Sequence, residues 1–127
     1  MKNAFLLAAA LLLLAIGCKK KDEIIATAGK GGKATVRVKP VYQERLIDSC
    51  VVYVTYNSKE AGAADDSVVQ RLNNQEAIAT FPQLRYGHYY FDVHAWDSVG
   101  QKRLRGGTAY EVSPEDSSVN MEVIVAP

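Results

Sequence analysis

The sequence has few of the side chains that enzymes most often use for catalysis. Its 127 residues include two cysteines, two histidines and one tryptophan. It contains no Gly-x-Ser-x-Gly motif, and the Lys-Gly-Gly-Lys stretch at residues 30–33 is too short for a phosphate-binding loop. No serine lies in a motif that would activate it as a nucleophile. We therefore expect no enzymatic activity and no cofactor.

The two histidines do not predict a metal site. Asp92 and His94 occupy positions i and i+2 of a predicted strand, about 6.6 Å apart along it. His88 lies six residues before His94, roughly 20 Å away along the same strand, and cannot join them. Two ligands from one strand are too few for a zinc or copper shell. We expect no metal, and an exposed polar strand face at these positions.

The sequence also lacks an apolar run long enough to span a bilayer, which takes about 20 residues. The apolar run at residues 4–16 follows a short basic start that contains Lys2. A run of about 7–15 residues between such a start and a small-residue cleavage site is typical of a secretory signal peptide. An uncleaved anchor helix or a buried core helix is the alternative. We expect a signal peptide at residues 1–17.

The end of this run, Ala15-Ile16-Gly17-Cys18, resembles the lipobox of bacterial lipoproteins. In that motif a small residue precedes the cysteine that is lipidated and becomes the new N-terminus. The resemblance implies a mature chain that begins at Cys18 and carries three acyl chains. Two chains already give stable anchoring, so the protein is expected to be held permanently in a membrane.

The residues after this cysteine resemble lipoprotein sorting signals. Lys19 stands where the inner-membrane retention signal of many Gram-negative bacteria has Asp, which implies the outer membrane. Lys21-Asp22-Glu23 resembles the Lys-acid-acid export tag of Bacteroidota-type surface lipoproteins, which implies exposure at the cell surface. The alternative for this triplet is a solvated charge run at the root of a tether.

The mature chain has no block of basic residues. Removing residues 1–17 takes away Lys2, one of 15 basic residues, and leaves 14 basic against 14 acidic residues. Nucleic-acid binding depends on clustered lysine and arginine. The short basic stretch at residues 102–105 is expected to be one exposed strand end. We therefore expect no nucleic-acid partner.

With Cys18 committed to lipid, no second cysteine remains to pair with Cys50 in a disulfide. Cys50 alternates with Val52 and Val54 at a period of two, which predicts burial in the core. Residues 18–32 are rich in charged and small residues and are expected to form a lipidated flexible tether. Residues 33–127 have the size of a single domain with one core.

The domain lacks helical periodicity and contains seven segments with strand patterns. Residues 34–42 alternate apolar and polar side chains, which is typical of a half-buried strand. Residues 49–57 are apolar on both sides, which predicts a central strand. Seven short strands at regular spacing predict an all-β, seven-stranded Greek-key β-sandwich. The expected strands are residues 34–42, 49–57, 67–72, 76–81, 88–96, 107–112 and 118–126.

Residues 80–95 carry the pattern Thr-Phe-x-x-Leu-x-x-Gly-x-Tyr-x-x-x-Val-x-Ala. This pattern resembles the carboxypeptidase-regulatory-like and collagen-adhesin B-type repeats, which are transthyretin-like (prealbumin-like) sandwiches. The resemblance implies that Phe81 ends a strand and that Leu84 plugs the end of the sandwich. It also implies that Gly87 makes a turn and that Tyr89 begins the core side of the next strand. Gly87 can adopt a positive φ, and the Tyr89 hydroxyl can bond back to the turn backbone.

The strand after this turn also supplies a candidate binding face. If Tyr89 and Phe91 face inward, a period of two sends the intervening residues outward. The candidate binding residues on this face are Tyr90, His94 and Trp96, because aromatic bodies with polar tips suit contact with sugar rings or protein. Ordinary surface side chains are the alternative. The outward residues are His88, Tyr90, Asp92, His94 and Trp96.

These features together predict a lipid-anchored, surface-exposed outer-membrane lipoprotein that acts as a non-catalytic binding or assembly module. The resemblance to surface lipoproteins implies an accessory subunit of a TonB-dependent nutrient-uptake complex. The alternative is a stand-alone glycan-binding module of the cell surface that uses Tyr90 and Trp96.

Overall fold

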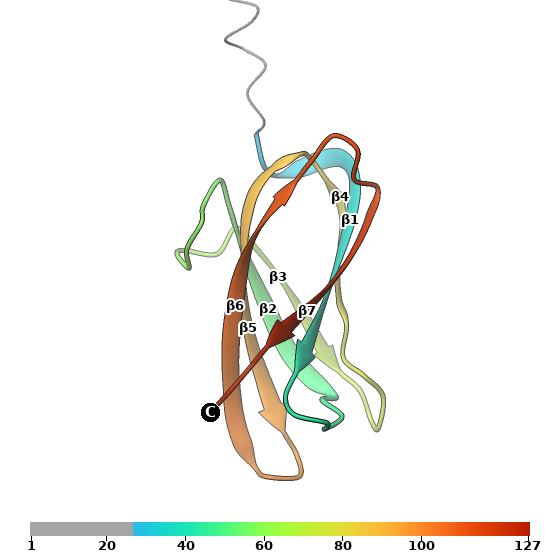
Figure 1. Ribbon diagram of the computed structural model, residues 1–127, viewed down its shortest axis with the longest axis vertical. Helices are drawn as coiled ribbons and strands as arrows, with labels where there is room; N and C mark the ends of the chain where they lie inside the picture. Colours follow the sequence, from blue (N-terminus) through green and yellow to red (C-terminus); the bar gives the residue numbers. More distant parts are fainter. Residues whose placement is uncertain (1–26) are drawn as a thin grey trace, which may run out of the picture.

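The computed structural model describes residues 27–127, which form seven β-strands in two sheets (Figure 1). The predicted signal peptide, the predicted lipidation site Cys18 and the tether as far as residue 26 lie outside the described residues. Within the described part of the chain, no helix is long and apolar enough to cross a membrane. The prediction of an all-β fold with seven strands is confirmed for residues 27–127.

All seven strands lie close to the segments expected from the sequence. In chain order they are β1 (Lys30–Val41), β2 (Ser49–Tyr56), β3 (Asp66–Arg71), β4 (Ala79–Leu84), β5 (Gly87–Asp97), β6 (Lys102–Val112) and β7 (Ser118–Ile124).

The strands are divided between a three-stranded sheet, in the order β4-β1-β7, and a four-stranded sheet, in the order β3-β2-β5-β6. β1 and β7 run parallel, and every other pair is antiparallel. β2 and β3 form one hairpin, and β5 and β6 form another. Each remaining connection passes from one sheet to the other, so the two sheets are tied together four times along the chain.

The core lies between the two sheets and follows from alternation along each strand. In β1, Val36 and Val38 are fully buried, whereas Arg37 between them faces outward. The rings of Phe81 and Phe91, one from each sheet, lie 5.5 Å apart between centroids. Cys50 is 1% exposed and belongs to this core, as the sequence predicted.

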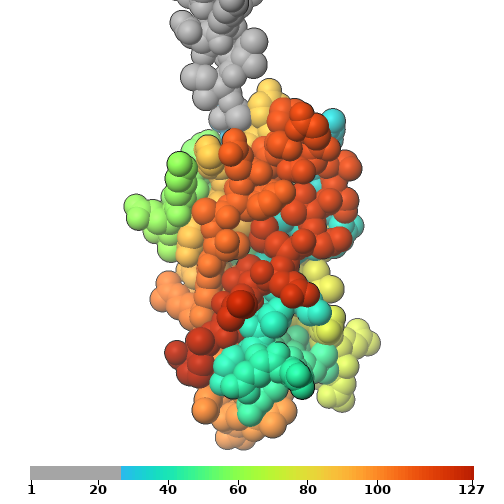
Figure 2. All heavy atoms as spheres, viewed as in Figure 1, coloured from blue at the N-terminus to red at the C-terminus, as the bar shows by residue number. Residues whose placement is uncertain are grey.

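The residues after β7 close one side of the sandwich. The backbone nitrogen of Val125 donates to the Val41 carbonyl at 2.9 Å, and Arg105 and Ala126 exchange two backbone hydrogen bonds. In the space-filling view this C-terminal segment lies against β6 and the connection that follows β1 (Figure 2). Gly106 permits the approach, because a Cβ there would contact the Ile124 carbonyl oxygen.

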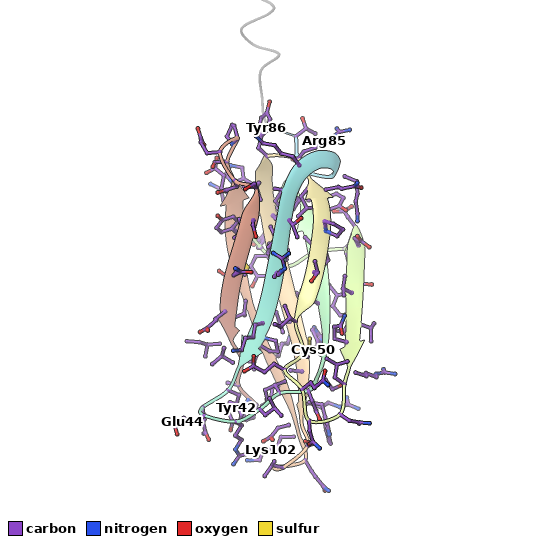
Figure 3. The ribbon with its side chains drawn as sticks, turned by 90° about the vertical axis from the view of Figure 1, so that its right-hand side faces the viewer. Tyr42, Glu44, Cys50, Arg85, Tyr86 and Lys102 are labelled. Carbon is purple, nitrogen blue, oxygen red and sulfur yellow. The ribbon has the colours of Figure 1, made fainter. Side chains whose placement is uncertain are left out.

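The two ends of the sandwich can be identified by the residues that lie there. Figure 3 places Arg85 and Tyr86 at the end where the described chain begins, and Tyr42 and Lys102 at the opposite end. We call these the entry end and the far end. β5 starts at the entry end with Gly87 and runs to the far end, where the turn after Asp97 leads into β6.

Three strands, β1, β4 and β6, differ from the expected segments by three residues or more at one or both ends. β1 begins at Lys30, inside the segment expected as tether, because Ala28 is buried and the chain is held from Gly29 onward. β4 continues past Phe81 to Leu84, so Phe81 does not end the strand. Its Pro82 is tolerated because β4 is an edge strand. β6 begins at Lys102, five residues before the expected start at residue 107, because it pairs with the whole length of β5.

The turn between β4 and β5 has the geometry expected of it. Gly87 has a φ of +150°, and a Cβ there would lie 2.8 Å from the backbone nitrogen of Ala28. The Tyr89 hydroxyl donates to the Arg85 carbonyl at 2.6 Å and accepts from the Gly29 amide at 2.9 Å. Glycine is therefore required on steric grounds, and the predicted bond from the Tyr89 hydroxyl to the turn backbone is confirmed.

At the far end, a buried ion pair joins the β1–β2 connection to the β5–β6 hairpin. The carboxylate of Asp97 is fully buried and pairs with Arg45, whose guanidinium also lies over the Tyr42 ring. Burial alone would raise the pKa of Asp97, but hydrogen bonds from the Gly100 amide, Arg45 and the Val99 amide lower it below its usual value. This carboxylate therefore stays charged and fixes the two loops against each other.

Candidate functional site

The candidate face predicted from the sequence is the outer face of β5, in the middle of the four-stranded sheet. The expected register is confirmed, because Tyr89, Phe91 and Val93 are fully buried while the residues between them point away from the core. The outward side chains are His88, Tyr90, Asp92, His94 and Trp96.

The register of the sheet sets which residues stand beside these side chains. Trp96 is opposite Arg103 in β6, and Ser49 in β2 is opposite Arg71 in β3. Because Cys50 pairs with Ala95, Ser49 stands next to Trp96. One row across the outer face is therefore Arg71, Ser49, Trp96 and Arg103. The next row is Val69, Val51, His94 and Arg105.

Residues of these two rows other than Val69, together with Tyr53, line an open groove of about 650 Å³ on the outer face, near the far end. Its size lies within the range of small-ligand sites. The residues after β7 form part of its border, and Ser49 and Val51 contribute its floor. No acidic side chain lines it. The aromatic and basic side chains that line the groove are those of Tyr53, Arg71, His94, Trp96, Arg103 and Arg105.

The charged groups in and beside this groove differ in whether they have hydrogen-bond or ion-pair partners. Asp92, at its edge, accepts hydrogen bonds from Arg105 at 3.2 and 3.4 Å and lies 3.2 Å from the Nε2 atom of His94. Its charge is therefore already matched by Arg105. Within residues 27–127, Arg71 and Arg103 form no hydrogen bond or ion pair. Both guanidinium groups are exposed and free to bind an anion.

The aromatic groups of the groove also retain free surface. The Trp96 side chain is 40% exposed, and in the described part of the chain its ring has no aromatic or cationic partner. Tyr53 is 37% exposed and meets the His94 ring edge to face at 5.2 Å. A large aromatic ring without a partner leaves apolar area in contact with water, which a ligand can cover.

Tyr90 has a different environment from the other two predicted residues. It lies over Gly107 on β6, where a Cβ would come within 2.9 Å of the Tyr90 ring. The ring covers exposed backbone of the neighbouring strand, and Tyr90 does not line the groove. It is also six residues from Trp96, about 20 Å along the strand. The structure thus brings His94 and Trp96 together and leaves Tyr90 apart.

Sequence reasoning missed Tyr53, Arg71 and Arg103 as members of this face. The sequence did contain one signal for Tyr53: residues 49–57 are apolar on both sides of the strand, so the side that faces away from the core also carries apolar side chains. β2 is central in its sheet, as predicted, but only one of its faces is covered within the described residues. Val51 is half-buried and Val69 on β3 is 52% exposed, so the outer face keeps an apolar centre. The two arginines join it through pairing between strands distant in sequence.

The outer face of the three-stranded sheet provides a comparison within the same molecule. Its β1 positions are Thr35, Arg37 and Lys39, and its β7 positions include Asn120 and Glu122. Arg37 donates to the Ser118 hydroxyl at 2.9 Å, and Lys39 pairs with Glu76 at 3.1 Å. Arg37 and Lys39 on this face therefore both have partners, and the face is mostly polar apart from Ile124 at the end of β7, which is 80% exposed.

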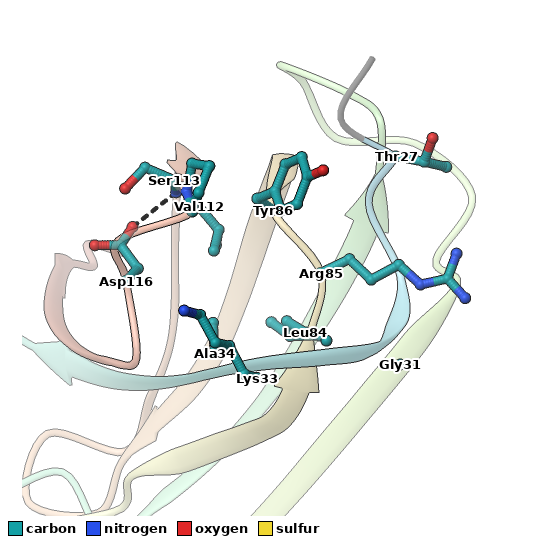
Figure 4. Close-up of a pocket in the computed structure, with 12 residues that line it drawn as sticks. Thr27, Gly31, Lys33, Ala34, Leu84, Arg85, Tyr86, Val112, Ser113 and Asp116 are labelled. Carbon is teal, nitrogen blue, oxygen red and sulfur yellow. Dashed lines mark hydrogen bonds between the residues drawn. The ribbon is translucent and has the colours of Figure 1, made fainter. Parts of the chain in front are cut away.

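A second concavity, of about 730 Å³, lies at the entry end between the start of β1 and the turns after β4 and β6 (Figure 4). Lys33 and Asp116 bring opposite charges to it, and Asp116 accepts the Ser113 amide at 2.8 Å. The Arg85 side chain extends away from Asp116 and packs over Gly31. None of the residues predicted as a site lies here, and its charges favour no single class of ligand.

The described residues hold no group of three or more potential metal ligands among His, Cys, Asp and Glu. Burial raises the pKa of the Cys50 thiol from 9.0 to about 11, so it remains protonated and enclosed at neutral pH. The groove therefore offers aromatic and guanidinium groups that have few partners within the described residues. In the comparisons with known proteins, no family model, no curated protein and no solved structure matches this chain.

Proposed function

We propose that this protein is a surface-exposed outer-membrane lipoprotein that acts as a non-catalytic binding or assembly module. The support for membrane attachment is the apolar run at residues 4–16, followed by Ala15-Ile16-Gly17-Cys18. The support for surface export is the Lys21-Asp22-Glu23 triplet. In this proposal the protein is an accessory subunit of a TonB-dependent nutrient-uptake complex.

We further propose that the sandwich has Greek-key, transthyretin-like topology. Two hairpins in one sheet and four connections between the sheets support this proposal. A second support is the turn between β4 and β5, where Leu84 is buried, Gly87 has a positive φ and the Tyr89 hydroxyl donates to the Arg85 carbonyl.

The observation that carries the binding function is the contrast between the two outer faces. On the face of the three-stranded sheet, Arg37 and Lys39 each have a partner, and the exposed apolar residue Ile124 lies at the end of β7. The face of the four-stranded sheet instead exposes Val69, Tyr53 and Trp96 beside arginines that are unpaired within residues 27–127. An exposed apolar centre with a polar rim is typical of an interaction site. A sheet face that met only water would gain nothing from these side chains.

The position of the groove fits attachment at the opposite end. Residue 27 begins the described chain at the entry end, next to Gly87, and Trp96 lies nine residues farther along β5, about 30 Å away. From Cys18 to residue 27 the chain can reach on the order of 30 Å when fully extended. A lipid anchor at Cys18 would therefore leave the groove on the side of the domain that points away from the membrane.

The alternative function, a stand-alone glycan-binding module, is favoured by the unoccupied ring surface of Trp96. Aromatic rings bind sugars through their apolar faces. The two functions differ in whether a protein complex accompanies the module, since an accessory subunit requires partners and a stand-alone module does not.

The test is native co-purification of the full-length, tagged protein from detergent-solubilised membranes. The wild type is expected to retain a defined set of outer-membrane proteins, which the Tyr53→Ala/Trp96→Ala variant loses. The control is Arg37→Ala/Lys39→Ala on the opposite sheet face, which is expected to retain them. Equal recovery from all three proteins would exclude the four-stranded face as the binding surface. Recovery of no protein partner, together with retention of a polysaccharide, would favour the stand-alone module.

A further inference from the structure

The side chains that line the groove beside Trp96 include arginines and no acidic residue. These arginines are Arg71, Arg103 and Arg105. Asp92 at its edge is paired with Arg105, and within residues 27–127 Arg71 and Arg103 have no ion-pair or hydrogen-bond partner. The side chain that the register places between these two arginines is the exposed Trp96.

From this arrangement we infer that the groove binds an acidic oligosaccharide, one whose sugars carry carboxylates as uronic acids do. This inference rests on the proposed binding function and names its ligand class. A sugar ring laid on the indole of Trp96 covers its free apolar surface. A guanidinium on either side can hold a carboxylate through paired hydrogen bonds.

The spacing of these groups suits a chain of sugars better than a single anion. Arg71 and Arg103 lie on strands separated by β2 and β5, so their backbones are about 14 Å apart across the sheet. Trp96 lies between them. A single carboxylate can satisfy only one of the two arginines, whereas a short oligosaccharide can present an acid to each and a ring to the tryptophan.

The size of the groove argues against an acidic protein as its occupant. A stable protein–protein interface covers roughly 800 Å² on each partner. The groove is a local depression of about 650 Å³, a volume typical of ligand sites. Beyond it toward the entry end, Tyr90 covers the backbone at Gly107, and His88 stands 4.0 Å from Glu111, so the cluster of arginines does not continue along the sheet.

The chain offers a direct probe of this site, because Trp96 is its one tryptophan. Its fluorescence can be followed in the full-length, detergent-solubilised protein while oligogalacturonate is added. The same titration with fully methyl-esterified oligogalacturonate keeps the sugar rings and removes the charge. A third titration, with poly-glutamate, keeps the carboxylates and removes the sugar.

We expect a saturable change in Trp96 emission with oligogalacturonate and none with the esterified form or with poly-glutamate. In the Arg71→Gln/Arg103→Gln variant the affinity should fall about tenfold or more, as expected for lost hydrogen bonds between charged groups. The matched control Arg37→Gln/Lys39→Gln removes the same charge from the opposite face and should bind within about twofold of the wild type. Added salt should weaken binding, because exposed ion pairs are screened.

Three results would overturn the inference. Equal binding of the esterified form would show a neutral-sugar site, and equal binding of poly-glutamate would show a site for acidic protein. Absence of any change in emission would show that acidic sugars do not bind. If co-purified membrane proteins still depend on Tyr53 and Trp96 in that last case, the proposed binding function stands and only the ligand class is rejected.

Discussion

The Tyr89 hydroxyl accepts a hydrogen bond from the Gly29 amide at 2.9 Å, although 60 positions separate the two residues. This bond ties the segment before β1 to the start of β5. It fixes the point at which the chain leaves the domain toward Cys18. The part of the chain that can act as a free tether is therefore shorter than the composition of residues 18–32 suggests.

Replacing Tyr89 with phenylalanine removes this hydroxyl and keeps the buried ring. The Gly29 amide and the Arg85 carbonyl then lose their partner, so we expect the free energy of unfolding to fall by about 1–2 kcal/mol. Denaturant titration measures the loss. Tyr86→Phe is the control, since Tyr86 is 43% exposed, and should change stability by less than about 0.5 kcal/mol. Equal stability of the two variants would contradict the role given to the hydroxyl.

Substitution of Gly87 by alanine tests the turn between β4 and β5. The new Cβ would lie 2.8 Å from the Ala28 backbone nitrogen at a φ of +150°, so strain and overlap both destabilise. We expect a loss of about 2–4 kcal/mol in denaturant titration, and more for valine. Gly62→Ala is the matched control, because its nearest neighbour is 3.8 Å away. A neutral Gly87→Ala would disprove the turn assignment and weaken the family resemblance.

Asp97 is expected to make the fold sensitive to acid. Its pKa is lowered in the folded protein below the usual value of 3.8, so its contribution to stability is complete above that value. The contribution is lost as the pH falls through the folded pKa. The Asp97→Asn variant should therefore melt at a lower temperature than the wild type at pH 7.

Melting curves between pH 7 and about pH 3 test this prediction. The difference between Asp97→Asn and the wild type should narrow as the pH falls. Glu115→Gln, at an exposed position, is the control and should track the wild type throughout. A gap between the Asp97→Asn and wild-type melting temperatures that stays constant with pH would mean that this carboxylate does not stabilise the fold through its charge.

The predicted lipid anchor is tested at Cys18. Cys18→Ala removes the only thiol beside the expected cleavage site, so incorporation of labelled palmitate and recovery in the membrane fraction should both be lost. Cys50→Ala is the matched control, because it removes the buried cysteine and leaves Cys18 in place; it should remain labelled and membrane-bound. Unchanged labelling of Cys18→Ala would refute the lipoprotein assignment.

The sequence predicted the structure best where apolar and polar residues alternate along a strand. The register of β5 followed from the period of its residues, and so did the burial of Cys50 and the central place of β2. The Tyr89 hydroxyl bond followed from the resemblance. These features depend on residues close together in the chain, whose pattern alone restricts the structure.

The remaining features depend on contacts between residues far apart in sequence. Ala28 looked like part of a tether, but it is buried against the turn at Gly87. Phe81 was expected to end a strand, but β4 continues through Pro82 to Leu84, because β4 lies at a sheet edge, where proline is tolerated. Arg71 and Arg103 gave no sequence signal of a site, because the pairing of four strands brings them to one row with Trp96.

The central claim is that the outer face of the four-stranded sheet is the binding surface, and site-specific photo-cross-linking in intact cells tests it most directly. A photoreactive amino acid is placed at Val69 on this face or at Ile124 on the opposite sheet; these side chains are 52% and 80% exposed. The account predicts a discrete cross-linked product from position 69 that disappears in the Trp96→Ala background, and none from position 124. Equal cross-linking from both positions, or a product from position 124 alone, would contradict it.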